Sequence, residues 1–129
     1  MNNTTKRIII VDDEEVILFG YKQVLSETWL VVDTAETVDE AKSLIGTNVY
    51  DAAILDLRLS NSMSLEGLEL IPFVKNARKE CRIIVVTAYG DETIRRKAID
   101  SGADLFLEKP VDPEDIKKTL ISMGIGPSI

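Results

Sequence analysis

Ile8-Ile9-Ile10-Val11-Asp12-Asp13 is a run of four branched apolar residues that ends in two carboxylates. An unbroken run of this kind is typical of a strand buried on both faces, as in a parallel sheet, and it predicts a first strand over residues 7–11. Four further apolar runs follow, at residues 30–35, 52–56, 82–87 and 104–107, with apolar residues at helical spacing between them. This alternation predicts an α/β fold: a doubly wound, five-stranded parallel sheet with helices on both faces.

Capping and breaking residues mark the helix boundaries. Asp91 and Asp112 stand where a helix should begin, and Pro113 would take the first helical position. Gly102 stands where a helix should end. Pro72 falls inside a helical stretch at 68–79, so that helix is expected to begin late or to kink.

Length and composition are those of one soluble domain. The chain has 129 residues with 45% hydrophobic content, enough for a core without disulfides or metal staples. We interpret 1–129 as a single domain, with a core at about 7–123 and a tail at 124–129. The polar N-terminus and the short apolar runs argue against a signal peptide or membrane span. Cys81 is the single cysteine, which excludes an internal disulfide and favours a reducing cytoplasm.

Charge and residue types narrow the chemistry. The net charge of −7 argues against direct nucleic-acid binding, which needs a basic surface. The chain contains no histidine, so the commonest general base and metal ligand is missing, and no phosphohistidine can form. Any reaction must therefore rely on carboxylates, lysine, arginine, hydroxyls or bound ions.

Chemically active side chains follow four of the five predicted strands: Asp12 and Asp13, Asp56, Thr87, and Lys109. In open α/β sheets, binding sites form beyond the carboxyl ends of the strands, so these side chains should meet at one rim. Carboxylates there repel one another, and a hard divalent cation such as Mg²⁺ relieves that repulsion. Lys109 and Thr87 would surround a phosphoryl group with ammonium and hydroxyl, and Asp56 can act as the nucleophile.

Each of these residues also has a structural interpretation. Asp12 and Asp13 could cap a helix that begins nearby, and Asp56 could open a turn. Thr87 alone carries little information, and Lys109 before proline could be an ordinary surface residue. The placement of such residues at the ends of four different strands favours the functional interpretation.

The chain resembles the receiver domains of two-component signalling, of the stand-alone, chemotaxis-regulator type, from Arg7 to about Met123. The motifs that carry the resemblance are Ile-Ile-Ile-Val-Asp12-Asp13-Glu, Ala-Ile-Leu-Asp56-Leu-Arg-Leu, Ile-Val-Val-Thr87-Ala-Tyr and Gly102-Ala-Asp-Leu-Phe106-Leu-Glu-Lys109-Pro110. The resemblance implies the flavodoxin-like strand order 2-1-3-4-5. It also implies no enzyme activity beyond accepting and slowly losing a phosphoryl group.

The resemblance assigns a role to each site residue. Asp56 matches the phosphoacceptor, and Lys109 matches the lysine that contacts the phosphoryl group. Asp12 and Asp13 match the acidic pair that holds Mg²⁺ together with Asp56 and the backbone carbonyl of Arg58. Asp13 is the expected direct ligand of that pair.

The resemblance also implies a route for the signal. Thr87 matches the switch hydroxyl and Phe106 the switch aromatic, and the Lys109–Pro110 peptide is expected to be cis. The signal should leave through the helix Glu92–Ser101, the last strand and the last helix.

A receiver implies partners. The phosphoryl donor would be a sensor histidine kinase or a phosphotransfer protein, and the recipient of the signal a downstream protein or effector domain. Arg95, Arg96 and Lys97 make the expected output helix locally basic. That face suits an acidic partner or a homodimer formed on phosphorylation, or is simply a solvated helix face.

The sequence departs from the family pattern after Asp56. Ser60 replaces the usual proline, and Gly67 stands three residues later than the usual glycine, so residues 60–64 form a longer loop. A tolerated surface insertion and a recognition loop are both open interpretations. The resemblance implies that the positions two residues after the phosphoacceptor and two after the switch hydroxyl border the path of the water that would hydrolyse the acyl phosphate, and these positions are Arg58 and Tyr89. Because both are large and neither is a carboxylate or amide, they predict slow self-dephosphorylation, over minutes or longer.

Three other functions compete with this one. A metal-dependent phosphatase of the haloacid dehalogenase type needs an acid two residues after its aspartyl nucleophile, where this chain has Arg58. A nucleotide-binding protein needs a glycine-rich loop after the first strand, and the sequence has none there. A receiver-like interaction module that is never phosphorylated would normally have lost a site residue, and all are present.

Overall fold

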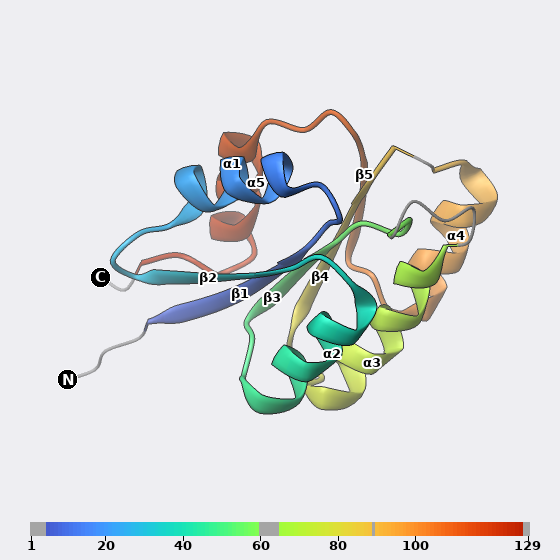
Figure 1. The fold of residues 1–129 in the computed structure, drawn as a ribbon, viewed down its shortest axis with the longest axis horizontal. Helices are drawn as coiled ribbons and strands as arrows, with labels where there is room; N and C mark the ends of the chain where they lie inside the picture. Colours follow the sequence, from blue (N-terminus) through green and yellow to red (C-terminus); the bar gives the residue numbers. More distant parts are fainter. Residues whose placement is uncertain (1–4, 60–64, 89, 128–129) are drawn as a thin grey trace.

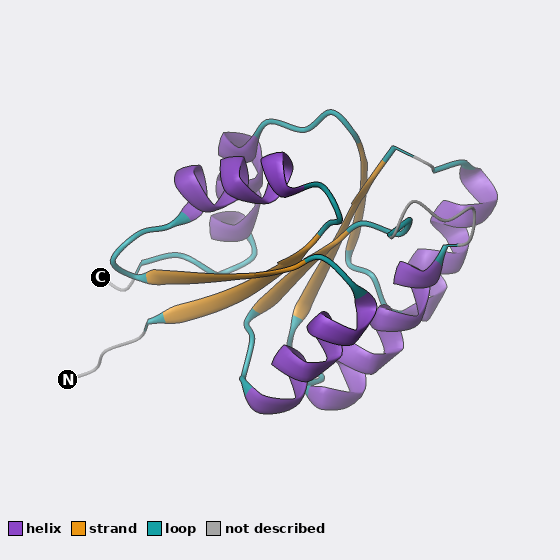
Figure 2. Ribbon diagram, viewed as in Figure 1, coloured by secondary structure: helices purple, strands orange, loops and turns teal. Residues whose placement is uncertain are grey.

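The computed structural model describes residues 5–59, 65–88 and 90–127, which form a parallel sheet between two layers of helices (Figures 1 and 2). The strands are β1 Lys6–Val11, β2 Leu30–Ala35, β3 Ala52–Leu55, β4 Arg82–Thr87 and β5 Leu105–Glu108. All neighbours are parallel, in the order β2-β1-β3-β4-β5, which confirms the predicted topology. The predicted strand boundaries are right to within one residue.

Helices cover both faces of the sheet (Figure 2). One layer consists of α1 Glu15–Leu25 and α5 Pro113–Ser122. The other consists of α2 Val38–Thr47, α3 Leu70–Ala77 and α4 Glu92–Ser101, and a short 3₁₀ helix, η1 Glu66–Glu69, leads into α3. Within the described part of the chain, no helix combines the length and apolar character that a membrane crossing requires.

The strand side chains alternate between two apolar cores. In β1, Ile8 and Ile10 pack toward α1 and α5, whereas Ile9 and Val11 pack toward α2 and α3. All four side chains are at most 1% exposed. This two-sided burial explains why the run is apolar without a break, and each such side chain stabilises the fold by roughly 1.5–3 kcal/mol.

The helix boundaries follow the predicted capping residues. The side chains of Asp91 and Asp112 accept hydrogen bonds from the first turns of α4 and α5, and Gly102 ends α4 with a φ of 125°. The predicted late start of the third helix is confirmed. It begins at Leu70, so Pro72 lies in its first turn, where backbone N–H groups have no intrahelical partner.

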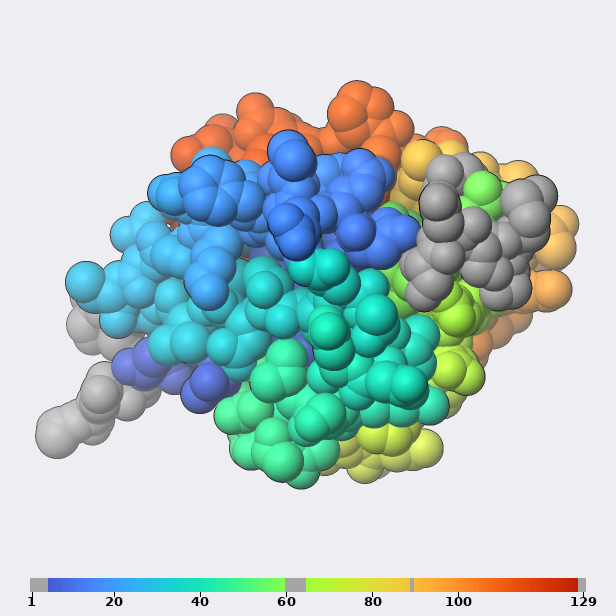
Figure 3. All heavy atoms as spheres, viewed as in Figure 1, coloured from blue at the N-terminus to red at the C-terminus, as the bar shows by residue number. Residues whose placement is uncertain are grey.

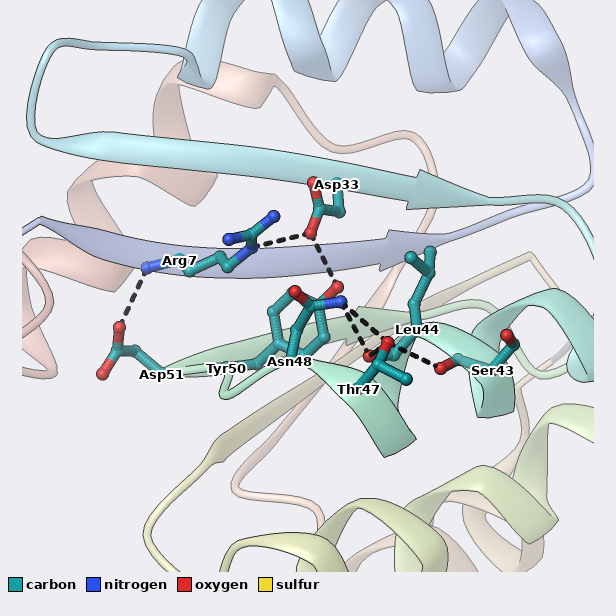
Figure 4. A network of polar contacts seen from close by, with 8 residues as sticks. All are labelled: Arg7, Asp33, Ser43, Leu44, Thr47, Asn48, Tyr50 and Asp51. Atoms are coloured by element: carbon teal, nitrogen blue, oxygen red, sulfur yellow. Dashed lines mark hydrogen bonds and ion pairs between the residues drawn. The ribbon is translucent and has the colours of Figure 1, made fainter.

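A polar network lies near the amino ends of β1 and β3 (Figure 4). Asp33 Oδ2 accepts hydrogen bonds from Arg7 Nε at 2.8 Å and from the Tyr50 hydroxyl at 2.7 Å. The backbone N–H of Arg7 donates to Asp51 Oδ2 at 2.9 Å, and Arg78 Nη1 donates to Asp51 Oδ1 at 3.1 Å. Each carboxylate of this network therefore has two donors.

Candidate functional site

The site lies at the carboxyl ends of the strands. Asp12 and Asp56 follow the parallel neighbours β1 and β3, and Thr87 is the last residue of β4. The backbone N–H of Asp56 donates to the Val11 carbonyl, and that of Lys109 to the Thr87 carbonyl, both at 2.9 Å. Backbone hydrogen bonding between neighbouring strands thus continues past the strand ends. It brings these residues to one rim of the sheet, as the sequence predicts.

Three carboxylates gather at this rim. Asp12, Asp13 and Asp56 each offer an oxygen, and these oxygens all lie within 4.8 Å of one another. Asp12 and Asp56 are buried, and Asp13 is half-buried. Asp12 does not cap α1, because the N-cap is Glu14 and no side chain caps this helix. Asp12 Oδ1 instead accepts a hydrogen bond from the backbone N–H of Glu14 at 2.9 Å, before the helix begins.

Lys109 bridges the two buried carboxylates. Its Nζ lies 2.6 Å from Asp12 Oδ2 and 2.9 Å from Asp56 Oδ2. Burial opposes the charged form of this amine, but its bonds to the two carboxylates outweigh burial and raise the pKa of Lys109, so it is a fixed cation. Burial raises the pKa of Asp12, and the hydrogen bond from Lys109 opposes that rise only in part.

The donor set suits a divalent cation. Two buried carboxylates share one lysine and a third carboxylate lies close by, and oxygen ligands of this kind select hard ions. The Arg58 backbone lies at this cluster, since its N–H donates to Asp56 Oδ1 at 3.3 Å. The role of the Arg58 carbonyl as a metal ligand stays a prediction.

The predicted switch residues lie on adjacent strands. Thr87 is fully buried at the end of β4, and Phe106 is half-buried in β5, where it pairs with Val85 of β4. The Lys109–Pro110 peptide is cis, as predicted. Tyr89 and the loop 60–64 fall outside the described residues, so the predictions that concern them stay untested.

Gly67 packs against the backbone of the site, although it stands three residues later in the sequence than the glycine that is usual in the family. A Cβ atom at this position would lie 2.2 Å from the Asp56 carbonyl oxygen and 2.7 Å from Leu57 Cα. The Gly67 N–H also donates to the Leu57 carbonyl at 2.7 Å. The chain after the longer loop therefore returns to pack against the backbone of Asp56, and only glycine leaves room for that contact.

Tyr21 is a residue of this region that sequence reasoning missed. It is buried in α1, and burial raises the pKa of its hydroxyl, which also senses the charges of Lys109, Asp12 and Asp56. With Gly20, Lys109 and the cis Pro110 it lines a groove of about 370 Å³ between α1 and the segment after β5. The helical spacing of Leu18, Tyr21 and Leu25 could have placed Tyr21 on the buried side of α1, but not beside Lys109.

The chain belongs to the response regulator receiver domain family, whose family model matches residues 8–121. Among curated relatives, the acid tolerance regulatory protein ActR of Rhizobium meliloti is 34% identical over 90% of this chain and 58% of its own length. The photosynthetic apparatus regulatory protein RegA of Cereibacter sphaeroides is 29% identical over 92% of this chain and 63% of its own. This chain thus spans less than two thirds of the length of these relatives.

Solved structures agree with this assignment. A CheY-like receiver domain protein from Methanospirillum hungatei has a TM-score of 0.81 and 32% identity, and the match covers 92% of this chain and 96% of that one. A response regulator from Burkholderia pseudomallei has a TM-score of 0.79 and 32% identity over 86% of this chain and 64% of that one. That structure contains a phosphorylated aspartic acid and a calcium ion. The present chain is therefore a receiver domain, the phosphoacceptor module of two-component signalling.

Proposed function

We propose that this chain accepts a phosphoryl group on Asp56, with Mg²⁺ held by Asp12, Asp13, Asp56 and the carbonyl of Arg58. The observation that carries the proposal is the Lys109 ammonium, which lies within 2.9 Å of both buried carboxylates, with the carboxylate of Asp13 close beside them. A phosphorylated aspartic acid and a calcium ion in the Burkholderia pseudomallei structure support it.

The reaction needs little covalent chemistry from the protein. An Asp56 carboxylate oxygen attacks phosphorus as the bond from phosphorus to the donor breaks, which leaves an acyl phosphate on Asp56. Lys109 is already within hydrogen-bond reach of Asp56 and would contact the phosphoryl oxygens, and Thr87 at the end of β4 would donate its hydroxyl. The bound cation supplies charge neutralisation for the phosphoryl oxygens.

The donor would be a sensor histidine kinase or a phosphotransfer protein, the partners that membership of the receiver domain family implies. A donor must cover the surface next to Asp56. Residues of α1 line a groove together with Lys109, which contacts Asp56, and Figure 3 shows α1 beside α5. Val16 and Phe19 of α1 are 83% and 66% exposed, so this helix presents apolar side chains to a partner. We expect this exchange to take place in the cytoplasm.

The signal would leave through α4, β5 and α5. The Thr87 hydroxyl would move toward the phosphoryl group, and the half-buried Phe106 ring would turn further inward to fill the space, a two-state shift that the phosphoryl group favours by its contacts. A downstream protein, an effector domain or a second copy of the chain would bind this surface. Arg95, Arg96 and Lys97 of α4 are exposed, the two arginines near Glu92, and this short basic stretch would suit an acidic partner.

The test is labelling with a small phosphodonor in the presence of Mg²⁺. The wild-type protein should gain one phosphoryl group, and both Asp56→Asn and chelation of Mg²⁺ should abolish the gain. Glu80→Gln removes a carboxylate that is 76% exposed and should leave labelling unchanged. Undiminished labelling of Asp56→Asn would place the acceptor elsewhere. Catalytic release of phosphate would indicate a phosphatase, and a wild type that is never labelled would indicate an interaction module.

A further inference from the structure

The Phe106 ring packs against a residue without a side chain. A Cβ atom built on Gly90 would lie 2.5 Å from Cζ of Phe106 and 2.6 Å from Cε1. The same point lies 3.6 Å from the Thr87 methyl carbon. The ring of Phe106, the methyl of Thr87 and the backbone of Gly90 therefore share one small space.

This space joins the phosphoryl site to the first turn of α4. Gly90 directly precedes Asp91, whose side chain accepts a hydrogen bond from the Ile94 N–H at 2.9 Å and caps α4. Ile94 and Phe106 both pack against the core cluster between the sheet and α2, α3 and α4. The ring of Phe106 in β5 thus packs against the residue that precedes α4. Both β5 and α4 belong to the expected output surface.

We propose that Gly90 is a positioning residue of the switch, which leaves room for the Phe106 ring to lie beside Thr87 and against the start of α4. The proposal rests on the switch role that the proposed function gives to Thr87 and Phe106. It adds a requirement to that role: any side chain at position 90 would deny the ring this position and weaken the coupling between Asp56 and the output surface.

Steric overlap gives the reason. A separation of 2.5 Å is well inside carbon–carbon contact, and the atoms concerned are those of a stiff ring rather than the end of a flexible chain. Overpacking of this kind forces a side chain out of its rotamer or shifts the backbone. Since Phe106 is only half-buried, its ring can escape by rotating outward into solvent. Alanine at position 90 should therefore favour conformations in which the Phe106 ring is turned outward into solvent.

The first experiment follows the ring directly. The chain has three phenylalanines, so protein labelled with fluorophenylalanine gives three ¹⁹F signals. The signal that is missing from the variant Phe106→Leu is that of Phe106. In Gly90→Ala the Phe106 signal should move toward the value of a solvent-exposed ring, while those of Phe19 and Phe73 stay in place. An unchanged Phe106 signal would overturn the proposal.

A double-mutant cycle separates the ring contact from a general effect of alanine in the loop. Gly90→Ala should lower the urea midpoint in the wild-type background but not in a Phe106→Ala background, where the obstructing ring is missing. Gly46→Ala in α2 is a control for an alanine that meets no neighbour, because nothing lies within 4 Å of a Cβ there, and it should not lower the midpoint. Equal losses in both backgrounds would show that Gly90 acts without Phe106.

The functional arm measures affinity for beryllofluoride, a phosphoryl mimic, in the presence of Mg²⁺. Gly90→Ala should bind it about fivefold more weakly than the wild type, the low end of coupling between sites. Unchanged or tighter binding would overturn the switch part of the proposal. Failure of the wild type itself to bind beryllofluoride would count against the proposed function. The ring contact would then still be judged by the ¹⁹F signal and the double-mutant cycle.

Discussion

The two ends of the sheet hold buried or half-buried carboxylates in opposite electrostatic conditions. Near the amino ends, Asp33 and Asp51 each have two donors, and the bonds from Arg7 and Tyr50 outweigh burial and hold the pKa of Asp33 below its usual value. At the carboxyl ends, Asp12 and Asp56 share Lys109, and burial raises the pKa of Asp12.

The difference separates a structural network from a binding site. The amino-end network is satisfied by its own side chains, so it ties β1, β2 and β3 together without any ligand (Figure 4). At the carboxyl ends the two buried carboxylates of Asp12 and Asp56 share one lysine, and a bound cation would lessen their mutual repulsion. A bound cation would relieve this repulsion and would then also offset the negative charge of an incoming phosphoryl group.

The largest expected effect is that of removing the shared cation. Lys109→Met leaves two buried carboxylates without a positive partner, so it should lower the free energy of unfolding by about 3 kcal/mol in metal-free buffer. Mg²⁺ should restore part of this loss. Arg7→Met at the opposite end is the control, and its loss should not respond to Mg²⁺. Urea unfolding with and without Mg²⁺ measures both, and an equal response of the two variants would contradict the comparison.

Carboxylate-to-amide changes at the two ends of the sheet should differ in their effect on the free energy of unfolding. Asp33→Asn weakens the bonds from Arg7 and Tyr50 and should destabilise the fold by about 1–2 kcal/mol. Asp56→Asn removes a charge that repels Asp12, so it should leave the stability unchanged or raise it. Urea unfolding of both variants in metal-free buffer measures these changes in the free energy of unfolding. A loss for Asp56→Asn as large as that for Asp33→Asn would show that the carboxyl-end cluster is not strained.

A smaller effect concerns the lifetime of the acyl phosphate, which the carboxyl end alone can form. Arg58 and Tyr89 are expected to crowd the water that attacks in line, so the wild type should lose its phosphoryl group over minutes or longer. The double variant Arg58→Ala, Tyr89→Ala should lose it about tenfold faster, equivalent to about 1.4 kcal/mol in the barrier. The measurement is the decay of purified phosphoprotein freed from donor. Decay within seconds in the wild type, or no acceleration in the variant, would exclude this role.

The smallest expected effect is on the pH dependence of stability. Because the pKa of Asp33 is lower in the folded state, its contribution is present above the ordinary value of 3.8 and is lost as the pH falls through the folded value. The stability gap between wild type and Asp33→Asn should therefore narrow below about pH 4 by a fraction of a kcal/mol, since this carboxylate is partly exposed. Urea midpoints over the acid range test this, and a gap independent of pH would contradict it.

Much of the fold and site could be predicted because the relevant signals are local. The run Ile8 to Val11 marks a two-faced strand through its own composition, and Asp91 and Asp112 cap helices through bonds to residues two or three positions away. Asp12, Asp56, Thr87 and Lys109 could be assigned to one rim because parallel strands all end on the same side of a sheet.

Other features depend on contacts between distant segments, which no local pattern encodes. The bridge from Lys109 to Asp12 spans 97 positions and that to Asp56 spans 53, and the bond from Arg7 to Asp33 spans 26. Strand register and the way each helix sits on the sheet decide which of these side chains meet.

The glycines show the same division. Gly102 could be read from the sequence as a helix end, because that role depends on its own backbone angle. The roles of Gly67 and Gly90 could not, since each depends on what packs against it: the Asp56 backbone in one case and the Phe106 ring in the other. The sequence states which residues lack a side chain, but the folded chain alone shows which neighbour fills that space.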